Sequence, residues 1–119
     1  MKCGIDILEI SSLPQNEKLE KFLIKYFNAE EIAYINTKAK KEQSIAGIFC
    51  AKEAFLKALE IGIGKIKLSD IIILHKENGA PFIKPTKNIV NLLNSLNFTK
   101  TEISISHAGN FATSICICE

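Results

Sequence analysis

The sequence predicts an α+β fold in a single domain, residues 1–119, with a mainly antiparallel sheet packed against a long central helix. The expected order is a strand, three helices, two strands, a helix and two strands. Three observations predict it. Apolar and small residues repeat with a helical period over residues 45–60. The dipeptide Asn78-Gly79 marks a tight hairpin. Residues 101–107 and 111–118 alternate as the two strands of a second hairpin.

The composition is that of an ordinary globular domain, with 47% hydrophobic and 24% charged residues. No apolar run is long enough to cross a membrane, and Asp6 precedes any apolar region, so we expect neither a membrane span nor a secretion signal. A net charge of +2 is too small to indicate nucleic-acid binding. The cysteines lack Cys-x-x-Cys spacing, which predicts small apolar packing in a reducing cytoplasm rather than a metal site. They are Cys3, Cys50, Cys116 and Cys118.

The N-terminal part predicts a strand and two helices. Residues 3–10 are rich in isoleucine, as in a strand covered on both faces. Asp6 is out of place there, either as a functional carboxylate or as the cap of a bend. Residues 14–27 predict a helix with an apolar stripe. Asn28 and Glu31 have the spacing of a capping box, which predicts the start of a short second helix.

The stretch from residue 45 to Glu60 predicts a helix that is buried all round. At about 100° per residue, its large apolar side chains fall on one face and its small residues on the opposite face. The apolar face consists of Ile45, Ile48, Phe55, Leu56 and Leu59, with Phe49 at its margin. The small face consists of Gly47, Ala51, Ala54 and Ala58. Gly62 and Gly64 are predicted to stop the helix.

Three charged residues interrupt this helix. Glu53 and Lys57 lie one turn apart, a spacing that fits either a surface ion pair or part of a site. Lys52 falls within the apolar face, where an ammonium needs a partner or a ligand unless its head reaches water beyond a packed stem. From these residues alone, the helix indicates a site without identifying its chemistry.

The C-terminal half predicts two hairpins around one helix. Residues 66–76 form one strand or two pieces broken at Ser69-Asp70, and Pro81 opens the returning strand. Thr86 is predicted to cap the helix that follows. Its inward residues are expected to be Ile89, Val90, Leu92, Leu93 and Leu96. His75 lies at a strand end before the turn and is predicted to be a surface residue without a role.

Four stretches form a recognisable set that covers nearly the whole chain. They are Gly4-Ile5-Asp6-Ile7-Leu8-Glu9, Phe49-Cys50-Ala51-Lys52-Glu53-Ala54-Phe55-Leu56-Lys57-Ala58 with Gly62-Ile63-Gly64, Asn78-Gly79-Ala80-Pro81, and Ile103-Ser104-Ile105-Ser106-His107 with Phe111-Ala112. In this order they resemble the motifs of the holo-acyl-carrier-protein synthases, the small bacterial 4′-phosphopantetheinyl transferases. The resemblance implies the 4′-phosphopantetheinyl transferase fold.

The resemblance implies an enzyme that acts on an acidic apo-acyl-carrier protein in support of fatty acid biosynthesis. In this family a serine hydroxyl of the carrier attacks the β-phosphate of coenzyme A, the phosphopantetheine arm is transferred and 3′,5′-ADP leaves. By resemblance, Asp6 and Glu53 are catalytic and hold Mg²⁺, and Lys57 neutralises a diphosphate oxygen. The base that activates the serine is either Glu53 or a water on the metal.

The resemblance also assigns the binding of coenzyme A. The residues concerned are Lys52, Lys57, Gly62, Gly64, Asn78, Gly79, Pro81, Ser106 and His107. In this family the elements around the 3′-phosphoadenosine end come from a neighbouring subunit, which implies a homotrimer with sites between chains. Without the resemblance, His107 would be interpreted as a structural hydrogen-bonding residue at a strand end.

This chain departs from the family pattern at positions that concern binding. Ile48 stands at a usually basic position, Ser12 lies near another, and Ala80 replaces a lysine of the turn. These departures leave the expected metal ligands unchanged but put carrier docking and phosphate binding in doubt. The competing hypotheses are a coenzyme A-binding or carrier-binding module that has lost catalysis, and a structural subunit of a larger assembly.

The first predicted helix offers a replacement for the missing basic residues. Its lysine stripe consists of Lys18, Lys21 and Lys25, with Ile24 beside it on the outward side. The hypothesis is that the stripe steers an acidic carrier while Ile24 makes an apolar contact. The alternative is a solvated helix whose lysines only offset the neighbouring glutamates.

Overall fold

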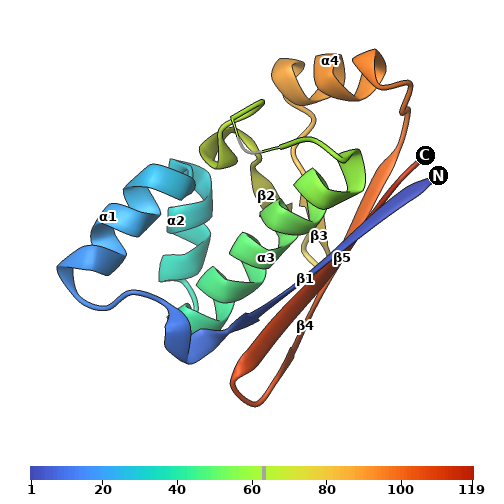
Figure 1. The fold of residues 1–119 in the computed structure, drawn as a ribbon. Coiled ribbons are helices and arrows are strands. Elements are labelled where there is room, and N and C mark those ends of the chain that lie inside the picture. The colour runs from blue at the N-terminus through green and yellow to red at the C-terminus, as the bar shows by residue number, and fades with distance from the viewer. Residues whose placement is uncertain (63) are drawn as a thin grey trace.

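The computed structural model describes residues 1–62 and 64–119 and confirms the predicted α+β architecture (Figure 1). The elements are β1 (Lys2–Glu9), α1 (Glu17–Tyr26), α2 (Ala29–Asn36), α3 (Lys41–Leu59), β2 (Ile73–His75), β3 (Pro81–Ile83), α4 (Lys87–Ser95), β4 (Thr101–Ala108) and β5 (Phe111–Cys118). Two short 3₁₀ segments, η1 (Ile10–Ser12) and η2 (Leu68–Asp70), lie between them. The order of helices and strands is the one predicted.

The strands form two antiparallel sheets. The larger sheet has the order β1-β5-β4, so the first and last parts of the chain pair with each other. Its register places Ile5 opposite Ile115 and Asp6 opposite Ser114. The smaller sheet is the β2–β3 hairpin, in which His75 lies opposite Pro81. Gly79 adopts φ +89°, which confirms the predicted Asn78-Gly79 turn.

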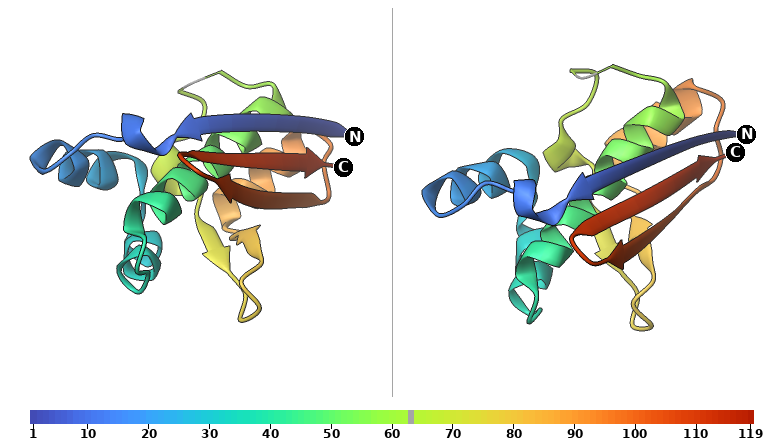
Figure 2. Two further views of the ribbon diagram at one scale, coloured as in Figure 1. Left: turned by 90° about the horizontal axis from the view of Figure 1, so that it is seen from below. Right: turned by 60° about the horizontal axis from the view of Figure 1, so that its bottom comes forward.

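Helix α3 packs on β1, β5 and β4 and forms the centre of the core (Figure 2). Its small residues allow this close approach. A Cβ atom added to Gly4 of β1 would lie 2.1 Å from the carbonyl oxygen of Ala54 and 2.5 Å from the nitrogen of Ala58. The opposite, apolar side of α3 is also buried, including Ile45, Ile48 and Phe55. The predicted burial is therefore confirmed for the apolar and the small face of the helix, whereas Lys57 on its flank is exposed.

Both helix caps at α2 and α4 are as predicted. The side chain of Asn28 accepts a hydrogen bond from the nitrogen of Glu30, and the nitrogen of Asn28 donates to Glu31, completing the capping box. Thr86 accepts from the nitrogen of Ile89 at the start of α4. Within α4, Ile89 and Leu93 are buried, but Val90 is 39% exposed, so its prediction as an inward residue is wrong.

The end of α3 differs from the prediction. The helix ends at Leu59, and Glu60 rather than a glycine takes the left-handed conformation, with φ 57°. Its side chain forms an exposed ion pair with Lys2, at 2.9 Å. Gly62 and Gly64 therefore lie beyond the stop. In the segment that follows, only Ile73–His75 is a strand, because η2 occupies the predicted break.

One face of the larger sheet is uncovered in the single chain. Side chains on β1 and β5 alternate, so Ile5, Ile7 and Ile115 point away from α3 and are 65%, 65% and 40% exposed. The prediction that the first strand is covered on both faces is thus wrong for the chain taken alone. Among the residues that the structure describes, none of the helices is long and apolar enough to span a bilayer.

Candidate active site

Asp6, Glu53 and Lys57 meet where β1 crosses α3. The pleat of β1 turns Asp6 toward the helix, and Lys57 lies one turn beyond Glu53. The ammonium of Lys57 lies 3.0 Å from Oδ1 of Asp6 and donates to the carbonyl oxygen of Ile5 at 3.2 Å. Lys57 thus pairs with the strand carboxylate rather than with Glu53 on its own helix, so the alternative of a simple intrahelical ion pair is not the one that forms.

Burial and neighbouring negative charge raise the pKa values of Glu53 and Cys50 at this site. Burial raises the pKa of Glu53 above its usual value, the negative charge of Asp6 adds to this, and Lys57 partly offsets it. Burial, with Asp6 and Glu53, raises the pKa of Cys50 to about 12. A site in which like charges disfavour each other attracts a cation.

The donor set fits Mg²⁺ better than a softer metal. Within the described residues, 1–62 and 64–119, no group of three or more His, Cys, Asp and Glu side chains is placed to hold a metal ion. Two carboxylates alone are what Mg²⁺ commonly takes from a protein, because phosphate oxygens and waters supply its other ligands.

A groove of about 620 Å³ opens beside Glu53. One wall is α3, one is the end of α1, and the third is the segment that contains η2. Its lining residues are Ile24, Lys25, Tyr26, Phe49, Glu53, Leu56, Gly64, Ile66, Lys67, Leu68 and Ser69. The lining is mainly apolar with lysines at two places. Such a groove suits a flexible chain that ends in a charged group at the carboxylates.

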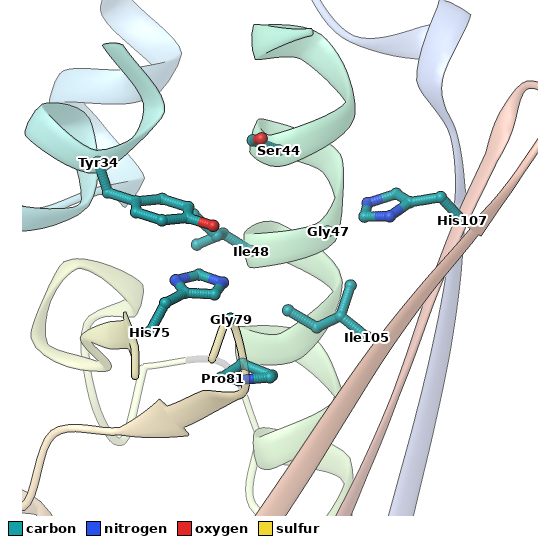
Figure 3. A pocket seen from close by; sticks show the side chains of 9 residues that line it. All are labelled: Tyr34, Ser44, Gly47, Ile48, His75, Gly79, Pro81, Ile105 and His107. Carbon is teal, nitrogen blue, oxygen red and sulfur yellow. The ribbon is translucent and has the colours of Figure 1, made fainter. Parts of the chain in front are cut away.

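A second cavity, of about 160 Å³, lies on another side of α3 (Figure 3). Tyr34 and His75 form one side of it, and Ile105 and His107 of β4 form the other. The remaining lining residues are Ser44, Gly47, Ile48, Gly79 and Pro81. Neither lysine nor arginine is among them. The predicted residues Gly79, Pro81 and His107 are therefore brought together around one space.

His75 is not the surface residue that the sequence predicts. Its ring stacks on Tyr34 with centroids 4.0 Å apart and planes within 4° of parallel. Its Nδ1 atom is buried and has no hydrogen-bond partner within the described chain. Burial, followed by the positive charge of Lys38, lowers the pKa of His75. The sequence contained one signal, the position of His75 beside the Asn78-Gly79 turn, and none for Tyr34.

His107 has a structural contact as well as its place in the cavity. Its Nε2 atom lies 3.0 Å from the carbonyl oxygen of Gln43. A Cβ atom added to Gly47 would lie 2.8 Å from the same Nε2 atom. Ser106 is the next residue on β4, so it faces the opposite side of the sheet and does not line this cavity. Asn78 caps its own turn by accepting from the nitrogen of Ala80. Gly62 lines neither space.

The prediction that Lys52 binds coenzyme A is contradicted. Its side chain is 0% exposed, and its ammonium lies 2.6 Å from Oε1 of Glu31, which is also 0% exposed. It donates two further hydrogen bonds to the carbonyl oxygens of Leu68 and Ile71, at 2.8 Å each. All three ammonium protons are thus used within the chain. The head of Lys52 does not reach water either, because burial and these acceptors enclose it.

The three departures from the family pattern occupy different surroundings. Ile48 is buried in the core and also borders the second cavity, where a longer basic side chain would compete for the space. Ser12 is exposed in η1 and donates to the carbonyl oxygen of Glu9. The nitrogen of Ala80 is bound within the turn. None of the three contacts Asp6 or Glu53 through a hydrogen bond.

Comparison with known proteins gives one consistent family. Residues 2–116 match the family model of the 4′-phosphopantetheinyl transferase superfamily. The holo-[acyl-carrier-protein] synthase of Finegoldia magna is 37% identical over 98% of this chain and 94% of its own length. That of Alkaliphilus metalliredigens is 41% identical over 88% of this chain and 87% of its own length. The crystal structure of the Helicobacter pylori holo-[acyl-carrier-protein] synthase in complex with coenzyme A superposes with a TM-score of 0.85 at 33% identity, covering 98% of this chain and 99% of that chain.

Proposed function

Because this chain belongs to the 4′-phosphopantetheinyl transferase superfamily, we infer that it is a holo-acyl-carrier-protein synthase. It transfers the 4′-phosphopantetheine arm of coenzyme A to a serine of apo-acyl-carrier protein, and 3′,5′-ADP is the other product. The observation that carries this function is the cluster of Asp6, Glu53 and Lys57, in which Glu53 also lines a mainly apolar groove. The rival hypothesis of an inactive binding module does not require two carboxylates so close that the charge of one raises the pKa of the other.

The reaction forms a bond between the serine oxygen and the β-phosphorus of coenzyme A and breaks the bond from that phosphorus to the oxygen shared with the α-phosphate. The serine loses its proton to a base, and the leaving 3′,5′-ADP carries away the negative charge. Catalysis of such transfers consists mainly of positioning and electrostatic stabilisation. Lys57 is 56% exposed at the site, so a diphosphate oxygen could reach its ammonium even while the ammonium pairs with Asp6.

Asp6 and Glu53 would hold Mg²⁺ in this enzyme. The raised pKa of Glu53, caused by burial and by the charge of Asp6, supports this assignment because a cation would relieve both effects. When bound, Mg²⁺ neutralises the charge that develops on the diphosphate. Lys57, which pairs with Asp6 in the chain, then has a diphosphate oxygen as its alternative partner.

We propose that two chains complete each site. The second cavity lies against residues 44, 47 and 48 of α3, and the groove lies against residues 49, 53 and 56. At about 100° per residue these two sets are centred about 150° apart on the helix. Because the two spaces lie on different sides of α3, we assign one end of coenzyme A to the cavity of one chain and the other end to the groove of a neighbouring chain.

The uncovered face of the larger sheet supports a homotrimer. Ile5, Ile7 and Ile115 are exposed there as neighbours in register, an apolar patch that a second and third copy would cover. We assign the interface between chains to this face. A monomer mass in analytical ultracentrifugation, with transfer activity retained, would contradict the assembly.

The carrier is proposed to dock on α1. Ile24 is 77% exposed, and with Lys25 it borders the groove that contains Glu53. A carrier held there by the lysine stripe would present its serine to the reaction centre.

The four cysteines are free thiols, which is consistent with the reducing cytoplasm where we place the enzyme.

The test is to incubate the protein with coenzyme A, Mg²⁺ and apo-acyl-carrier protein and to measure the intact mass of the carrier. The expected result is a mass increase equal to one phosphopantetheine arm, together with 3′,5′-ADP. Binding of coenzyme A or carrier without a mass increase would favour the inactive binding module and overturn the proposed activity. Omission of Mg²⁺ in the presence of a chelator is expected to abolish the increase.

A further inference from the structure

The buried ion pair of Lys52 and Glu31 joins three parts of the chain that are separate in sequence. Lys52 comes from α3 and Glu31 from α2, while the other acceptors of the ammonium are the carbonyl oxygens of Leu68 and Ile71. Oε2 of Glu31 in turn accepts from the nitrogen of Ile73, at 2.9 Å. The pair therefore fixes the backbone at both ends of η2 and at the start of β2.

That backbone is one wall of the groove beside Glu53. Residues 66–69 line the groove opposite Phe49, Glu53 and Leu56 of α3. Within η2 itself none of the side chains is fully buried, and Leu68 packs against the core only in part. The hydrogen bonds from Lys52 to Leu68 and Ile71 add to this packing and fix the distance between the wall and the helix.

We propose that Lys52 and Glu31 are positioning residues, which set the width of the groove and thereby the binding of the pantetheine arm of coenzyme A. Lys52 faces the core while Glu53, the next residue, faces the groove, so a single turn of α3 both anchors the wall and carries the reacting carboxylate. The choice of coenzyme A as the affected substrate rests on the proposed function. The positioning of residues 68–73 does not depend on it.

The test compares Lys52→Met, Glu31→Gln and the double variant. Each single variant leaves a buried charge without its partner and is expected to lower the melting temperature strongly. The double variant removes both charges and is expected to recover most of that loss. The hydrogen bonds to Leu68 and Ile71 remain absent in it, so its KM for coenzyme A should stay several-fold above that of the wild type, with kcat changed less.

The nearby ion pair of Glu30 and Lys84 provides the matched control. It also joins α2 to the region of β3, at 2.6 Å, but its side chains are 48% and 40% exposed. The double variant Glu30→Gln with Lys84→Met removes the same two kinds of charge at the surface. It is expected to change neither the melting temperature nor the KM for coenzyme A appreciably.

Hydrogen exchange tests the same inference without any activity. In the wild type, the amides of residues 70–73 should exchange slowly, and in the Lys52→Met, Glu31→Gln double variant they should exchange faster while the amides of β5 remain protected. The inference is overturned if the double variant regains both stability and the wild-type KM, or if residues 70–73 exchange rapidly in the wild type. If the wild type transfers no phosphopantetheine, the proposed function is overturned. The hydrogen-exchange result then still decides whether Lys52 and Glu31 position residues 70–73.

Discussion

Lys52 and Lys57 lie five residues apart on α3, and each forms an ion pair with a carboxylate from another element. Their surroundings are opposite. Lys52 and Glu31 are both 0% exposed and every ammonium proton has an acceptor, whereas Lys57 is 56% exposed beside Asp6. The difference teaches which charge is free to act. A fully enclosed ion pair has no access to a substrate and holds structure, and a half-open one can exchange its partner for a ligand.

The largest expected effect concerns the open site. Asp6→Asn and Glu53→Gln should each lower the turnover of carrier by about 100-fold or more, because each removes a charge that organises the diphosphate without changing side-chain size. The measurement is the initial rate of holo-carrier formation at saturating Mg²⁺. The control is Glu42→Gln, at an exposed glutamate in the first turn of the same helix, which should leave the rate unchanged. Near-normal turnover in either site variant would refute the assignment.

The second prediction is that Lys52 matters more for stability and Lys57 more for turnover. Lys52→Met should lower the free energy of unfolding by about 3–5 kcal/mol, since it leaves Glu31 buried and unpaired. Lys57→Met should change that free energy by less than about 1 kcal/mol, because its ion pair is exposed to solvent. Turnover should show the opposite order per unit of folded protein, with the greater loss in Lys57→Met. Chemical denaturation and rate measurements on the same samples check both statements, and equal stability losses would contradict the distinction.

Much of this arrangement is predictable from sequence. The capping box of Asn28 and Glu31 and the position of the central helix follow from local patterns that the structure reproduces. The small residues on one side of α3 predict close packing, and the sheet supplies it at Gly4. The motifs predict Asp6 and Glu53 as the metal-binding carboxylates, and the packing of β1 on α3 brings these two residues close together.

The parts that sequence did not predict depend on distant contacts. The sequence indicates that Lys52 needs a partner, but it does not identify that partner. Glu31 is explained locally by the capping box, so its ion pair with Lys52 cannot be predicted from the spacing. The stack of Tyr34 on His75 joins α2 to β2, and no local spacing relates them. Helix α3 ends at Leu59, and Glu60 takes the left-handed conformation although it is not a glycine. The prediction placed the stop at Gly62 and Gly64 because glycine adopts this conformation most readily.

The third prediction extends the comparison to the open surface of α1. Reversal of Lys18, Lys21 and Lys25 to glutamate should raise the KM for the carrier several-fold at low ionic strength, while the KM for coenzyme A stays unchanged. Added salt should reduce the difference from the wild type. The matched control reverses three exposed lysines elsewhere in the chain, Lys41, Lys87 and Lys100. Unchanged constants in the stripe variant, or an equal change in the control, would place carrier docking elsewhere.

The smallest expected effect is a pH dependence of stability. Because burial and Asp6 raise the pKa of Glu53 above 4.5, the native chain binds this proton more tightly than the unfolded chain. The contribution of Glu53 to stability is therefore greatest below its unfolded pKa and is lost as the pH rises through its folded pKa. Glu53→Gln has no carboxyl group to titrate and therefore does not lose this contribution. In metal-free buffer, the melting temperature of the variant minus that of the wild type should therefore increase between about pH 4 and about pH 7. A difference that is constant or shrinks with pH would contradict the raised pKa.

The central claim is that the half-open cluster of Asp6, Glu53 and Lys57 is the reaction centre, and metal titration tests it most directly. Mn²⁺, titrated by calorimetry into the wild type with coenzyme A present and no carrier, is expected to bind at one site per chain. Asp6→Asn and Glu53→Gln should each weaken that binding by about tenfold or more, since loss of even an outer-shell partner commonly costs 10- to 100-fold. Unchanged Mn²⁺ affinity in both variants would show that the metal and the diphosphate bind elsewhere, and would contradict the account.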